Sequence, residues 1–197
     1  MNNSPVLKLQ EMASSSSTDI EELLARAKMI SVKLDLKDIS EWLEHELNGY
    51  PSSDLLPDYR VLRDVPIRAF NPYVGWIPYQ LGNTQGQHKD VYDLLTTVHI
   101  NNPVSMLIEY AKHDNTLYSD LPSLMADFLQ KAGNCDFRMA YSINPTQITK
   151  ILSNTRSRIL DWALLLERKG ILGEGLLFSL EEKKEAAGMT VNNINNF

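Results

Sequence analysis

The 197-residue chain has one cysteine, Cys135, and only four histidines. A single cysteine excludes an internal disulfide framework and is typical of proteins in a reducing compartment. No apolar run of about 18 residues occurs, so no membrane span is predicted. The N-terminus also lacks the basic flank and apolar run of a signal peptide. We therefore expect a cytoplasmic protein with no membrane partner.

The motifs of common catalytic and cofactor sites are also missing. There is no HExxH or CxxC motif, no phosphate-binding glycine loop and no Gly-x-Ser-x-Gly elbow. We expect no metal and no cofactor, and a non-enzymatic function is favoured. The remaining catalytic candidates are more simply interpreted as surface or core residues; they are His45, His88 with Asp90, His113 with Asp114, and Cys135.

The best-specified element is a helix predicted over residues 144–170. Asn144 is a suitable N-cap, Pro145 suits the first helical position, and Gln147 completes a capping box. Gly170 suits a left-handed C-terminal cap. Apolar residues at helical spacing predict a broad buried face; they are Ile148, Ile151, Leu152, Thr155, Ile159, Trp162, Ala163 and Leu166.

Two further helices near the N-terminus are predicted to form a helical hairpin. The first begins at a capping box of Thr18 and Glu21 and ends near residue 33. The second begins at Asp35 and ends at Gly49. Its stripe consists of Ile39, Trp42, Leu43, Glu46 and Leu47.

Three segments have the composition of strands, namely 59–70, 73–81 and 135–142. Pro66 predicts an edge strand or a break in the first of them. Other short helices are predicted at 4–13, 103–111 and 122–132, and after a capping box of Ser179 and Glu182. The prediction is an α+β fold: a mostly helical single domain over 1–188 with a helical hairpin, a small antiparallel sheet and a long C-terminal core helix. Residues 189–197 are predicted to be a polar tail or linker stub.

A basic edge flanks the apolar stripe of the long helix. It consists of Lys150, Arg156 and Arg158. Such an edge can meet phosphates or the acidic groups of a partner. The alternative is salt bridging to the acidic helices at 19–48, where eight carboxylates stand against four basic residues. The net charge of −6 gives no general footprint for nucleic acid.

Two segments resemble the AbiTii domain of bacterial abortive-infection proteins. They are DLKDISEWLEHELNGYPSSDLLPDYRVL at 35–62 and RSRILDWALLLERKGILGEGLLFSLEEKKEA at 156–186. The resemblance implies a role in phage defence and supplies no catalytic residues. Asn48, Tyr50, Asp58 and Tyr59 fall in its turn segments. These polar and aromatic residues can line a surface site or can cap the end of the helix.

The resemblance and the missing catalytic motifs together predict a phage-defence module that acts by binding or self-assembly. Its partner would be a second copy, another defence protein or a phage component. One alternative is a toxin or nuclease-like enzyme with a site built from loops 49–60 and 81–90. Another is a nucleic-acid-binding module that uses the basic edge, which is possible but not favoured.

Overall fold

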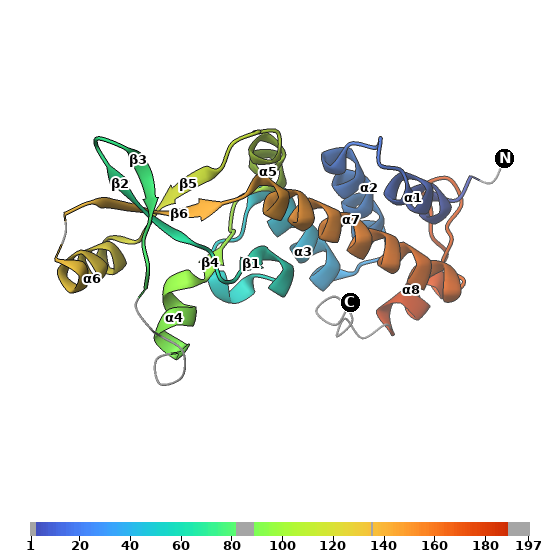
Figure 1. The fold of residues 1–197 in the computed structure, drawn as a ribbon. Helices are drawn as coiled ribbons and strands as arrows, with labels where there is room; N and C mark the ends of the chain where they lie inside the picture. The colour runs from blue at the N-terminus through green and yellow to red at the C-terminus, as the bar shows by residue number, and fades with distance from the viewer. Residues whose placement is uncertain (1–2, 82–88, 135, 189–197) are drawn as a thin grey trace.

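The computed structural model describes residues 3–81, 89–134 and 136–188. Helices gather at one end of the molecule and a small antiparallel sheet lies at the other (Figure 1). The helical end contains α1 (Pro5–Ser14), α2 (Ile20–Lys33), α3 (Lys37–Asn48) and α8 (Leu180–Ala187). This arrangement confirms the predicted α+β fold with a mostly helical core.

Helix α7 (Pro145–Arg168) runs the length of the molecule and joins the two ends (Figure 1). Its first turns pack Ile148 and Ile151 into the core beneath the sheet. Its last turns pack Ile159, Trp162 and other residues into the helical core. The predicted capping box of Asn144 and Gln147 is present, and Gly170 has a φ of +73°. The local signals of the sequence therefore determine both ends of this helix.

The helical hairpin forms as predicted, but both predicted starts are wrong. The side chain of Asp19, rather than Thr18, caps α2 and accepts the N–H groups of Glu21 and Glu22. Asp35 does not cap α3, because it has a φ of +58° and belongs to the left-handed turn between the helices. Leu36 takes the N-cap position without a side-chain hydrogen bond, and its buried side chain holds the turn in place.

The four-stranded sheet has the order β3-β2-β6-β5, and all its pairs are antiparallel. It consists of β2 (Ile67–Asn71), β3 (Gly75–Pro78), β5 (Leu117–Asp120) and β6 (Arg138–Ile143). The break predicted at Pro66 separates β2 from β1 (Val61–Leu62), which pairs with β4 (Val98–His99) in a second sheet. Strand β6 leads directly into α7, so the sheet fixes where α7 begins.

Several elements were not predicted from the sequence. They are α4 (Lys89–Thr96), β4 and β5, together with the 3-10 turns η1 (Ser53–Leu55) and η2 (Asp58–Arg60). The helices predicted at 103–111 and 122–132 are α5 (Val104–Ala111) and α6 (Ser123–Gly133). His88, Cys135 and the predicted tail at 189–197 lie outside the described residues. No helix in the described ranges is both long and apolar enough to cross a membrane.

Candidate functional site

The end of α3 brings three side chains toward α7. Trp42 and Glu46 are four residues apart and therefore share one face of the helix. Gly49 ends the helix with a φ of +93°, and a Cβ there would lie 2.9 Å from the carbonyl oxygen of Asn101. Because glycine lacks that atom, the N–H of Tyr50 can donate to the same carbonyl at 2.9 Å. The tyrosine side chain is thereby directed back to Glu46.

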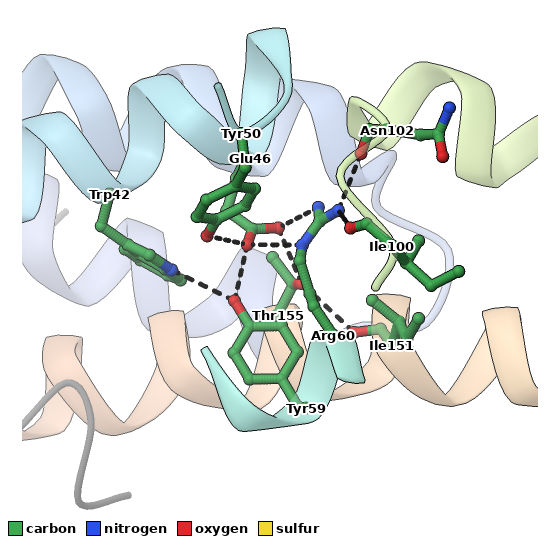
Figure 2. A network of polar contacts seen from close by, with 9 residues as sticks. All are labelled: Trp42, Glu46, Tyr50, Tyr59, Arg60, Ile100, Asn102, Ile151 and Thr155. Atoms are coloured by element: carbon green, nitrogen blue, oxygen red, sulfur yellow. Dashed lines mark hydrogen bonds and ion pairs between the residues drawn. The ribbon is translucent and has the colours of Figure 1, made fainter. Parts of the chain in front are cut away.

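Glu46 forms a fully buried ion pair with Arg60 of η2 (Figure 2). Both side chains have an exposed fraction of 0%. The guanidinium Nη2 and Nε donate to the two carboxylate oxygens at 2.7 and 3.0 Å. The remaining guanidinium nitrogen, Nη1, donates to the carbonyls of Ile100 and Asn102 at 3.1 and 2.7 Å. This bidentate geometry leaves the arginine with partners on every nitrogen.

Three hydroxyl groups complete the shell around the carboxylate. Tyr50 and Tyr59 donate to Glu46 Oε1 at 2.7 and 2.6 Å, and Thr155 of α7 donates to Oε2 at 3.1 Å. The indole N–H of Trp42 in turn donates to the Tyr59 hydroxyl at 3.1 Å. We call Trp42, Glu46, Tyr50, Tyr59, Arg60 and Thr155 the α3–α7 network (Figure 2).

Burial and the carboxylate together set the protonation of this network. Burial raises the pKa of both Tyr50 and Tyr59, and the negative charge of Glu46 raises each further. Burial alone would lower the pKa of Arg60, but the hydrogen bonds and charge of Glu46 outweigh it and raise the pKa. The two tyrosines thus remain neutral donors, and the ion pair remains charged.

The α3–α7 network is built to hold segments together. Its residues come from α3, η2 and α7, and its arginine reaches the chain at residues 100–102. Breaking such a buried pair by removing one partner costs about 3–5 kcal/mol. The carboxylate has acceptor contacts on both oxygens and no exposed surface. No substrate can therefore reach it in this conformation.

The structure divides the turn residues named from the sequence. Tyr50 and Tyr59 belong to the α3–α7 network. Asn48 is exposed and donates to Glu44 on the outside of α3. Asp58 points to solvent with a side-chain exposure of 90% and lies 3.8 Å from Arg63. The turn residues therefore do not converge on one surface site.

The basic edge of α7 is also divided. Lys150 is exposed. Arg156 donates to the carbonyls of three residues that connect α1 with α2, namely Met12, Ser15 and Thr18. Arg158 instead stacks on the Tyr59 ring, with its guanidinium carbon 4.6 Å from the ring centroid. In the described residues, neither arginine forms an ion pair with the acidic helices at 19–48. The salt bridges expected there are absent.

Glu46 and Arg60 were missed as a pair. Glu46 is one of the residues of the apolar stripe of α3, and a carboxylate on a buried stripe requires a buried partner. That requirement was the available signal. The sequence does not identify the partner, because Arg60 lies in a segment predicted to be a strand and meets Glu46 only through the tertiary fold.

Two open cavities are present among the described residues. One of about 290 Å³ lies between the segment 98–102 and β5, with Tyr110, Ile143 and Ile148 in its walls. Another, of about 370 Å³, is lined by residues 16–20 and by Arg156 of α7. Within the described parts of the chain, no three His, Cys, Asp or Glu side chains are grouped to hold a metal ion.

Comparison with known proteins decides the family. The model of the AbiTii family matches residues 5–191, which is nearly the whole chain. The chain belongs to the AbiTii family. No curated protein and no solved structure matches it. The AbiTii match spans both the α3–α7 network and the sheet, so the domain of this family includes both ends of the molecule.

Proposed function

We propose that this AbiTii chain acts in abortive-infection phage defence as a protein-binding module rather than as an enzyme. Family membership supports the defence role. The sealed α3–α7 network carries the choice of binding over catalysis. It holds the most concentrated set of polar groups described, and its carboxylate and guanidinium have no exposed surface. These residues therefore support the fold.

Exposed apolar side chains at the sheet end of the molecule support a binding surface there (Figure 1). Tyr73, in the turn between β2 and β3, is 94% exposed, and Leu124 of α6 is 85% exposed. Other exposed side chains on these elements and on β5 are Phe70, Tyr118 and Phe128. Large exposed apolar groups close together mark protein interaction sites more often than isolated ones do. We therefore place the contact with a partner protein of complementary apolar surface at this end.

A phage-challenge assay tests the proposal. Cells that express the intact protein are compared with cells that express Tyr73→Ser, Leu124→Ser, His45→Ala or Asp58→Ala at equal soluble levels. The two serine variants should lose at least about tenfold of the protection, because each removes exposed apolar contact area without touching the core. The two alanine variants should protect like the wild type.

The opposite result would favour the enzyme alternative with a site at residues 49–60. The other half of that alternative, 81–90, falls largely outside the described residues. The mass of the wild-type protein in solution then identifies the class of partner. A concentration-dependent dimer or larger assembly that the serine variants abolish indicates a second copy. A monomer indicates another defence protein or a phage component.

A further inference from the structure

Arg158 and Trp162 carry two buried donors that no described group satisfies. The Arg158 Nη1 and the indole Nε1 of Trp162 are both buried without a hydrogen-bond acceptor. Trp162 is only 4% exposed. Such unsatisfied donors are rare in native proteins, and each one costs about 1–3 kcal/mol. Their presence side by side therefore requires an explanation.

The two donors lie on the same face of α7. They are four residues apart, which places their side chains next to each other on successive turns. The ring of Tyr59 lies 4.6 Å from the Arg158 guanidinium carbon and holds the guanidinium plane against it. Arg158 is only half-buried, so its environment still opens toward the solvent. The pair is thus fixed in place and open to a small group.

The other inward-pointing arginines show what this chain does with a guanidinium. Arg60 has Glu46 and two carbonyls as acceptors, and Arg156 has three carbonyls. Arg158 differs from both, since it has a stacked ring but no acceptor on Nη1 and no carboxylate at ion-pair distance among the described residues. A water molecule can satisfy a donor, but it does not balance a partly desolvated positive charge. An anionic oxygen does both.

We propose that Arg158 and Trp162 bind an oxyanion, a carboxylate or phosphate group carried by a small ligand. Its oxygen would accept from Arg158 Nη1 and from the Trp162 indole. Because Tyr59 stacks on Arg158 and also donates to Glu46, the ligand would lie beside the α3–α7 network without entering it. The proposal goes beyond the protein-binding function and concerns the opposite end of α7 from its contact surface.

The indole N–H resonances of the intact protein test this directly. The chain has three tryptophans, and the signal of Trp162 is the one lost in Trp162→Phe. Inorganic phosphate and acetate are titrated separately at constant ionic strength, with chloride as the balancing anion. A saturable shift of the Trp162 signal, with the Trp76 signal of β3 unchanged, is expected with at least one of them. The more tightly bound anion identifies the ligand group as phosphate or carboxylate.

Variants of α7 complete the test. Arg158→Gln should weaken the anion at least about tenfold, whereas Lys150→Gln on the exposed side of the helix should leave the titration unchanged. If Arg158→Gln does not fold, Arg158→Lys provides the comparison, because it keeps the charge and loses the planar donor. The proposal is overturned if neither anion gives a saturable shift. It is also overturned if the arginine variants respond as the wild type does.

Discussion

Replacing Glu46 by glutamine tests how much the α3–α7 network stabilises the fold. The substitution keeps the shape of the side chain but removes its charge and turns one acceptor into a donor. Five donors point at the carboxylate in the wild type, from Arg60, Tyr50, Tyr59 and Thr155. In the variant, the amide N–H₂ faces some of these donors, and the Arg60 charge stays buried without a counter-charge.

Loss of one partner of a buried ion pair costs about 3–5 kcal/mol. A change of 1 kcal/mol shifts the melting temperature of a domain of this size by roughly 2–4 °C. We therefore expect Glu46→Gln to lower the free energy of unfolding by about 3 kcal/mol or more and the melting temperature by roughly 6–20 °C. Urea unfolding at pH 7 measures the first quantity, and calorimetry measures the second.

The control is Glu41→Gln, which makes the same chemical change at an exposed position of the same helix. It should change the free energy of unfolding by no more than about 0.5 kcal/mol. If the two variants unfold at the same urea concentration, the buried pair contributes no more than a surface charge. The structural role assigned to the network would then be wrong.

Three other predictions concern pH, a glycine and a helix cap. Because the pKa of Tyr59 is raised in the fold above its ordinary value of 10.0, the folded state holds the proton longer. Stability should therefore fall as pH rises above about 10, by up to 1.4 kcal/mol per pH unit, and Tyr59→Phe should reduce this slope in urea titrations. Gly173→Ala should lower the melting temperature more than Gly170→Ala: both glycines have positive φ, but only the Cβ at Gly173 would lie 2.7 Å from Phe178. Equal losses would refute the packing argument. Ser179→Ala should cost about 1 kcal/mol by removing the cap of α8, seen as faster amide exchange in that helix; unchanged exchange would contradict it.

The elements predicted well are those whose signals are local. Asn144 with Gln147 and Ser179 with Glu182 both form the capping boxes expected from the sequence. The apolar stripe of α7 is buried as predicted, apart from partial exposure of Leu152. Each signal depends on residues within a few turns of one another, so the tertiary fold does not change its meaning.

The elements missed depend on contacts between distant segments. Strand β5 is an edge strand with mostly exposed residues, so it lacks the alternation that identifies a half-buried strand. The α3–α7 network joins Glu46 to Thr155, 109 positions away. Tyr59 and Arg158 were both named from the sequence, but for separate reasons, and only the fold stacks one on the other.

Phage protection by folded Glu46→Gln tests most directly the claim that the network supports the fold and performs no chemistry. The measurement is made at a temperature below the melting temperature of the variant, with equal amounts of folded protein in variant and wild-type cells. We predict equal protection, because binding needs the fold and not the carboxylate. Loss of protection by a folded variant would contradict the account and place Glu46 in a reaction.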